Sequence, residues 1–214
     1  MGIVSESFAN LNEFLTTELK KSKKTGLPAD LVLQHLLKPF LPMNIRCTSG
    51  TVTDITDRQA GPFDVIASLD AFPAFGEGSA ATVLADGAVF ALQVRNWAES
   101  DLTQFGDLAR QLKKLERKKK GPVPCFAISF ARLALAEVSQ FLNSRAGQPV
   151  DGVLCIGHHV VLRNSSGAYG NPERVPFVTE PEAAEALKAF TFFLLKLSQE
   201  ALGRPFGLAD YQHL

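Results

Sequence analysis

Apolar residues are spaced along the chain in two patterns, one typical of helices and one typical of strands. In five segments they recur every three or four residues, which gives a helix one apolar face. These predicted helices cover residues 5–20, 28–41, 102–120, 133–145 and 181–202. The segments between them are continuously apolar or alternate between apolar and polar residues, as strands do. The predicted strands cover residues 45–54, 63–70, 88–97, 123–131 and 150–165, the last as a strand or a hairpin.

The order of these elements indicates the fold class. A helix, two or three strands, an amphipathic helix and a further strand follow one another, as in an α/β protein whose mixed central β-sheet is flanked by helices. Gly61-Pro62 marks a break before the second strand, and residues 71–87 are expected to form an irregular connection. The 214 residues suffice for one domain. We expect an N-terminal helix and a basic linker over residues 1–25, and a single α/β domain with a C-terminal helix over residues 26–214.

Composition and charge exclude several classes of protein. Hydrophobic residues make up 46% of the chain, which excludes wholesale disorder. The 22 Lys and Arg residues balance the 22 Asp and Glu residues, which excludes a broadly basic binder but leaves a local basic patch open. The sequence shows neither a membrane-spanning stretch nor a leader pattern. Its three cysteines are expected to be buried thiols, so we expect a cytoplasmic protein without a membrane partner.

Polar residues interrupt two of the apolar strands. Asp64 lies in the predicted strand 63–70, and Gln93 and Arg95 share one face of the predicted strand 88–97. A polar pair on the face of a central strand is costly unless it is solvated, paired or functional. Two interpretations are open: Arg95 forms a partly buried ion pair with Asp64, or the three residues belong to a functional site.

Short motifs between residues 26 and 120 resemble those of one superfamily. The matching pieces are Gly26 with Asp30, FLP at 40–42, SGTVTD at 49–54, FDVIASLD at 63–70 and FALQVRNWAESDL at 90–102. An acid on one strand, then an apolar strand with (D/E)-x-K, then an amphipathic helix is the pattern of the PD-(D/E)XK nuclease-like superfamily. The chain is similar to this superfamily, and more narrowly to an uncharacterised bacterial domain family within it. The resemblance implies a restriction-endonuclease-like core.

The resemblance also implies a set of site residues. In active members, carboxylates hold Mg²⁺ and a lysine acts on the water that attacks a phosphodiester. By the motif, Asp64 matches the metal-binding acid, Gln93 the second acid, Arg95 the lysine, and Asp30 the acid of the first core helix. Asp30 is also in helical phase with Leu33, which directs it towards the sheet. The expected metal ligands are Asp64 and Gln93, with Mg²⁺ as cofactor of an active enzyme and no cofactor of an inactive one.

Gln93 and Arg95 depart from the (D/E)-x-K pattern. Gln93 offers an amide oxygen but no negative charge, and the guanidinium of Arg95 keeps its proton and cannot act as a general base. We therefore favour a catalytically degenerate nuclease-like protein that binds nucleic acid or a protein, in phage defence or in a mobile element. Whether the chain is an enzyme stays open. The alternatives are an active Mg²⁺-dependent nuclease that hydrolyses phosphodiester bonds, and an immunity or adaptor module that binds only proteins.

Three other features suggest surfaces rather than chemistry. The predicted helix 102–120 has a basic outer face, which is a sequence-independent surface for nucleic acid or simply a solvated face. Its candidate contacts are Arg110, Lys113, Lys114 and Arg117. The last predicted helix is apolar on more than one side, so it is buried inside the domain, against a second copy in a homodimer, or against a partner protein. His158 and His159 are adjacent on a predicted strand, point to opposite faces, and are expected to be structural.

Overall fold

One mixed sheet forms the centre of the computed structural model, which describes residues 3–21, 27–76, 81–118, 121–163, 176–179 and 183–204. Its nine described strands follow the order β3-β4-β1-β2-β5-β6-β7-β8-β9. They are β1 (Ile45–Thr53), β2 (Gln59–Leu69), β3 (Ala74–Phe75), β4 (Ala81–Leu84), β5 (Ala88–Arg95), β6 (Cys125–Ser129), β7 (Gly152–Cys155), β8 (His159–Arg163) and β9 (Pro176–Thr179). The pairs β1–β4, β5–β6 and β6–β7 are parallel, and the remaining pairs are antiparallel.

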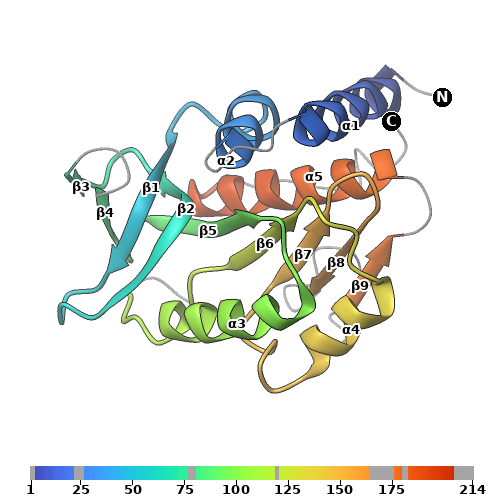
Figure 1. The fold of residues 1–214 in the computed structure, drawn as a ribbon. Helices are drawn as coiled ribbons and strands as arrows, with labels where there is room; N and C mark the ends of the chain where they lie inside the picture. Colours follow the sequence, from blue (N-terminus) through green and yellow to red (C-terminus); the bar gives the residue numbers. More distant parts are fainter. Residues whose placement is uncertain are drawn as a thin grey trace.

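Helices cover both faces of this sheet (Figure 1). On one face lie α1 (Ile3–Lys21), α2 (Leu27–Leu31), which continues directly into the π-helix η1 (Val32–Leu37), and α5 (Ala183–Ala201). On the other face lie α3 (Glu99–Lys113) and α4 (Leu135–Asn143). This arrangement confirms the predicted α/β class and the mixed sheet flanked by helices.

The two faces of the sheet bury two separate apolar cores. Val65 and Leu92 belong to the core under α1, α2 and α5, whereas Ile66 and Ala91 belong to the core under α3 and α4. Successive side chains of β2 and β5 therefore alternate between the cores, as the two-residue period of a strand requires. Both faces of these strands are apolar, which explains why their sequences read as nearly continuous apolar runs.

The apolar faces of α5 are buried inside the chain. The ring of Phe192 meets Phe8 of α1 edge to face, with 5.8 Å between ring centroids. The rings of Phe190 and Phe193 each lie 5.7 Å from Phe126 of β6. Because α5 packs between α1 and the sheet, its composition is accounted for without a second copy or a partner protein.

The structure differs from the predicted elements around β1 and β2. Strand β2 begins at Gln59, so the break predicted at Gly61-Pro62 is wrong and the dipeptide lies inside the strand. The β1–β2 register shifts between Gly50 and Val52, opposite this dipeptide. A bulge there leaves Pro62, which has no N–H, outside the regular ladder.

Residues 71–87 hold two short strands, β3 and β4, where the sequence predicts an irregular connection. Strand β4 pairs in parallel with the end of β1, from Gly50 with Ala81 to Thr53 with Leu84. Such a pairing joins segments that are far apart in sequence, so no local pattern encodes it.

Helix α3 ends at Lys113, well before the predicted end at residue 120. The N–H of Glu116 donates to Asp54 Oδ2 at 2.9 Å, and the N–H of Lys118 donates to Asp86 Oδ1 at 2.6 Å. These amides bond to side chains of the sheet connections instead of to carbonyls of a further helical turn, which ends the helix.

Parts of five predicted elements lie outside the described residues. They are residues 22–25 of the basic linker, 77–80 of the irregular connection, 119–120 of the helix predicted over 102–120, 164–165 of the predicted hairpin and 181–182 of the last helix. Within the described residues, no helix is long and apolar enough to cross a membrane.

Candidate functional site

Asp64 and Gln93 lie on the neighbouring strands β2 and β5. These strands are antiparallel, and their described pairing ends with Val65 and Leu92, one residue short of Asp64 and Gln93. On its other side Gln93 pairs with Ala127 of β6, which belongs to the core under α3 and α4. The two residues that the sequence analysis names as metal ligands thus lie on adjacent strands.

The Asp64 carboxylate is half-buried and is fixed by β5. Its Oδ2 accepts a hydrogen bond from the Val94 N–H at 2.7 Å. Burial raises the pKa of Asp64 above its ordinary value, and the Val94 N–H and the positive charge of Arg95 offset this only in part. A nearby cation would stabilise the charged form of such a carboxyl group. Asp64 is therefore suited to bind a cation.

Gln93 is buried, and its amide oxygen is not satisfied by the protein. The residue is 1% exposed, and Oε1 has no hydrogen-bond partner among the described residues. An unpaired buried acceptor costs free energy, and most such groups in folded proteins are paired. The Gln93 oxygen beside Asp64 is thus an acceptor position that a bound cation or donor would satisfy.

Arg95 is exposed and does not form the ion pair with Asp64 that one interpretation of the sequence offers. The described side chains include no ion pair between these two residues. The guanidinium carbon of Arg95 instead lies 5.7 Å from the ring centroid of Trp97, within the range of a cation–π contact. Trp97 is itself held by a hydrogen bond from its indole N–H to the Ile128 carbonyl at 3.1 Å. The Arg95 charge therefore remains available to a ligand at the end of β5.

Asp30 and Asp64 line the same pocket, which has a volume of about 390 Å³. Asp30 is exposed on α2, and Leu33, in phase with it, lines the pocket as well. The pocket also includes Ser49 and Gly50 of β1. The structure thus places Asp30 opposite the strand that carries Asp64, whereas Gln93 is not among the pocket-lining residues.

The glycine of the SGTVTD segment is required by close packing. Gly50 has a φ of +138°, and a Cβ atom there would lie 1.9 Å from the carbonyl oxygen of Ala81. Only glycine allows β4 to approach β1 this closely. Gly50 therefore shapes one wall of the pocket through the backbone.

The carboxylates of the site are few. Within the described part of the chain, no group of three or more His, Cys, Asp or Glu residues is placed to hold a metal ion. Mg²⁺ prefers an octahedral set of oxygen ligands and is usually bound by one or two carboxylates together with water and phosphate. Asp64, the Gln93 amide and the more distant Asp30 could hold such an ion only with substrate or water completing its shell.

Most of the cations predicted to contact nucleic acid form hydrogen bonds or ion pairs with other residues of the protein. Their partners are Asp107 for Arg110, Asp151 for Lys113 at 2.5 Å, and the Ala88 carbonyl for Arg117 at 2.6 Å. Lys114 is exposed at the end of α3, and the structure describes no hydrogen bond or ion pair for its side chain. A ligand on this face would compete with structural contacts at three of the four positions.

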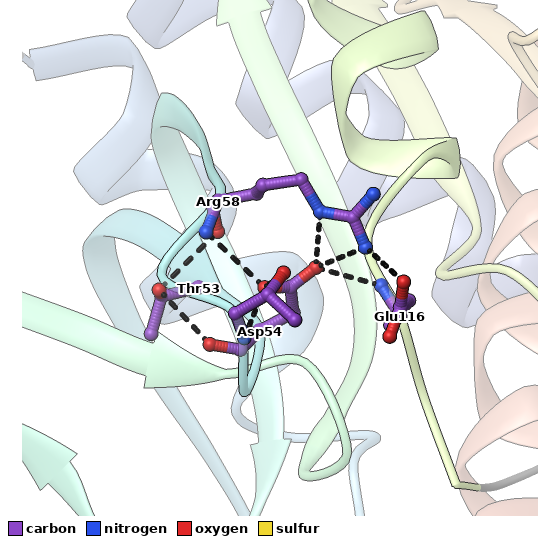
Figure 2. Close-up of polar contacts among 5 residues, drawn as sticks. Thr53, Asp54, Arg58 and Glu116 are labelled. Atoms are coloured by element: carbon purple, nitrogen blue, oxygen red, sulfur yellow. Dashed lines mark hydrogen bonds and ion pairs between the residues drawn. The ribbon is translucent and has the colours of Figure 1, made fainter.

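A second polar cluster ties the β1–β2 hairpin to the segment after α3 (Figure 2). We call it the Asp54 latch; it consists of Asp54, Thr56, Arg58 and Glu116. The Asp54 side chain has no exposed surface and accepts hydrogen bonds from Thr56, Arg58 and the Glu116 N–H, and Arg58 also pairs with Glu116 at 2.8 Å. Burial alone would raise the pKa of Asp54, but the hydrogen bonds from Glu116, Thr56 and Arg58 outweigh it and hold the pKa well below its usual range.

The Asp54 latch explains a motif that the sequence analysis assigned only by resemblance. Asp54 is the last residue of SGTVTD, and both of its oxygens are filled by internal donors. Its role is therefore structural. The sequence shows only an acidic residue directly after a β-branched strand. Nothing in that pattern indicates that its partner, the Glu116 N–H, lies more than fifty residues away.

These elements define the class of fold. Helix α2 with η1, the antiparallel strands β1, β2 and β5, helix α3 and the parallel strand β6 follow the order of the restriction-endonuclease-like core that the sequence resemblance implies, with Asp64, Gln93 and Arg95 on two neighbouring strands. Among solved structures, the chain is similar to NucC of E. coli MS115-1 in a cAAA-bound form, with a TM-score of 0.72 and 15% identity over 94% of this chain and 91% of that chain.

Two further solved structures give the same result. NucC of P. aeruginosa ATCC27853 in a cAAA-bound form has a TM-score of 0.70 and 12% identity over 95% of this chain and 100% of that chain. The apo form of E. coli MS115-1 NucC has a TM-score of 0.68 and 13% identity over 94% of this chain and 100% of that chain. No protein-family model matches the chain, and no curated protein matches its sequence significantly. At these identities the likeness establishes the fold.

Proposed function

We propose that the protein is a nuclease-like protein of phage defence that binds nucleic acid through a catalytically degenerate site. The observation that carries this proposal is that Asp64, which matches the metal-binding acid of the motif, is held by the Val94 N–H of β5, while the same strand carries the neutral amide Gln93 where the motif has its second acid. The exposed Arg95 supports binding of a phosphate, because a guanidinium pairs with phosphate oxygens but does not accept a proton from water. The likeness in fold to NucC supports a nuclease origin.

An active Mg²⁺-dependent nuclease is the second candidate, and the Gln93 oxygen favours it. That oxygen is buried without a partner among the described residues, next to a carboxyl group whose pKa is raised by burial. Asp64 and Gln93 would hold the ion, with Asp30 across the pocket. Bound Mg²⁺ would polarise the phosphodiester and stabilise the charge that develops on it.

Cleavage and binding assays with the purified protein test this proposal. Labelled single- and double-stranded DNA and RNA are incubated with Mg²⁺, Mn²⁺ or EDTA, with Asp64→Ala in parallel. We expect binding that weakens as salt is added, and no cleavage with either metal. Metal-dependent cleavage that Asp64→Ala abolishes would establish the second candidate instead. Absence of binding to every nucleic acid at low salt would favour a module that binds only proteins.

Binding of cAAA is a further part of the proposal. Two of the similar NucC structures are cAAA-bound forms. In this chain, a pocket of about 560 Å³ lies next to the end of α5, and Asn44, Asp70 and Phe72 line it. Arg46 donates to the Phe72 carbonyl at 2.6 Å, so its guanidinium lies at the edge of this pocket. An aromatic ring, an amide and a guanidinium are the groups that proteins use to bind bases and phosphates.

Titration calorimetry with cAAA tests this part separately. We expect saturable binding, and an affinity about tenfold lower in Phe72→Ala because a base loses its stacking partner. Phe75→Ala is the matched control, since Phe75 is 55% exposed and does not line the pocket. No binding of cAAA by the unmodified protein would remove this ligand from the proposal without affecting nucleic-acid binding.

A further inference from the structure

A separate pocket of about 470 Å³ opens at the carboxyl ends of β6 and β7. Its walls are the segment 132–135 that leads from β6 into α4, the turn 157–159 between β7 and β8, and Ala183 at the start of α5. None of its lining residues belongs to the pocket of Asp30 and Asp64. In open α/β sheets, ligands bind at the carboxyl ends of the parallel strands.

The titratable side chains that line this pocket are all of the basic type. They are Arg132, His158 and His159, and no acidic residue is among the described residues of the lining. Arg132 is exposed, and no hydrogen bond or ion pair to a described residue holds its guanidinium. A planar guanidinium next to two imidazoles is a donor set suited to an oxyanion, above all to phosphate.

The start of α4 lies at the pocket but is already capped. Ala134 precedes the nine residues of α4, and the amide end of a helix carries a partial positive charge. The Glu137 carboxylate accepts the Ala134 N–H at 3.0 Å and offsets this charge. Arg132 and the histidines therefore provide the contacts for an anion.

The pocket is connected to the candidate site along one edge of the sheet. Arg95 pairs with Ser129 of β6, and Ser129 pairs with Cys155 of β7. The chain then leaves β6 through Phe130, whose N–H donates to the Arg95 carbonyl at 3.3 Å. Two strand spacings of about 4.8 Å each place Cys155, the last residue of β7 and two residues before the pocket-lining Gly157, about 10 Å from Arg95. A strand of nucleic acid at Arg95 thus reaches this pocket within a few nucleotides.

We propose that this pocket is a phosphate-binding subsite for the backbone of a nucleic-acid strand that crosses the candidate site. Arg132 supplies the main contact, and His158, exposed on the turn, supplies a second donor. The subsite positions the strand without reading its sequence, because phosphate contacts carry no base information. This inference rests on the proposed binding of nucleic acid.

Fluorescence anisotropy with labelled 20-nucleotide single- and double-stranded DNA, over a series of KCl concentrations, tests the subsite. Loss of one phosphate contact in Arg132→Ala is expected to weaken binding several-fold and to lower the slope of log affinity against log salt by about one. His158→Ala is expected to weaken binding as well, and Arg132→Lys to retain most of it. Arg204→Ala is the matched control, because Arg204 is exposed beyond the opposite end of α5, about 30 Å from Ala183.

The outcomes separate the subsite from the proposed function. If the unmodified protein binds DNA and Arg132→Ala binds it as Arg204→Ala does, the subsite is wrong and the proposed function stands. If the unmodified protein binds neither DNA nor RNA, both are overturned. Inorganic phosphate serves as a competitor and is compared with KCl at the same ionic strength. If phosphate displaces DNA from the unmodified protein no better than KCl does, a contact with the nucleic-acid strand is supported. If low concentrations of phosphate displace the DNA, the pocket binds a free anion instead.

Discussion

Mg²⁺-dependent cleavage of DNA is expected to appear in the double substitution Gln93→Glu with Arg95→Lys. The change places a second carboxylate on the strand next to that of Asp64, at the position where the motif has its second acid. It also replaces a fixed guanidinium by an amine that is able to take up a proton. General-base catalysis alone contributes about 10²–10⁴-fold, so cleavage is expected to rise by at least about 100-fold over the unmodified protein. Release of labelled fragments with Mg²⁺ and with EDTA measures it.

Three comparisons make this prediction specific. Gln93→Glu alone is expected to bind Mg²⁺ more tightly but to cleave less than the double variant. Adding Asp64→Ala to the double variant is expected to abolish the gain. Because position 93 is buried, the new carboxylate is expected to lower the melting temperature in EDTA, and Mg²⁺ to restore it. A double variant that is folded and binds Mg²⁺ yet cleaves nothing would show that the degeneracy extends beyond these two positions.

A marked loss of stability is expected from Asp54→Asn. The substitution puts an NH₂ group in place of one of two oxygens. At Oδ2 it faces Arg58 Nε and the Glu116 N–H, which donate at 2.9 Å each, and at Oδ1 it faces the N–H groups of Thr56 and Arg58, which donate at 2.8 Å and 3.1 Å. The N–H groups that donate to this oxygen would then face another donor and would stay buried without an acceptor. A buried donor without an acceptor costs more free energy of folding than the loss of one hydrogen bond. We expect the melting temperature at pH 7 to fall by about 5–10 °C. Asp57→Asn is the matched control, since Asp57 is exposed in the same hairpin and has a φ of 60°, which asparagine also adopts.

The same variant makes the pH dependence testable. The pKa of Asp54 is lowered in the folded protein, so its contribution to stability is present above the ordinary aspartate pKa of about 3.9. That contribution is lost as the pH falls from there towards the lower folded pKa. Melting curves of the two proteins are therefore expected to converge below about pH 4. A difference in melting temperature that is the same at pH 3 and pH 7 would contradict the role of the Asp54 charge.

The sequence predicts the central part of the candidate site because strands have a fixed period. Asp64, Gln93 and Arg95 stand out as polar residues in apolar strands, and Asp30 shares the phase of Leu33. The structure places Asp30 and Asp64 in one pocket and the Asp64 carboxylate against the Val94 N–H of β5. The unpaired Gln93 oxygen and the contact of Arg95 with Trp97 depend on how side chains from β5, β6 and α3 pack together, and no local pattern contains that information.

The sequence by itself determined the α/β class and the strands that carry Asp64, Gln93 and Arg95. Local periodicity and residue identity decide these features, and neither depends on distant contacts. Only the tertiary structure decided where α3 ends, that β4 joins β1, that α5 is covered by α1 and the sheet, and that Asp54 is a latch. Each of these depends on hydrogen bonds or packing between segments far apart in the chain, whose free energy appears only when the fold brings them together.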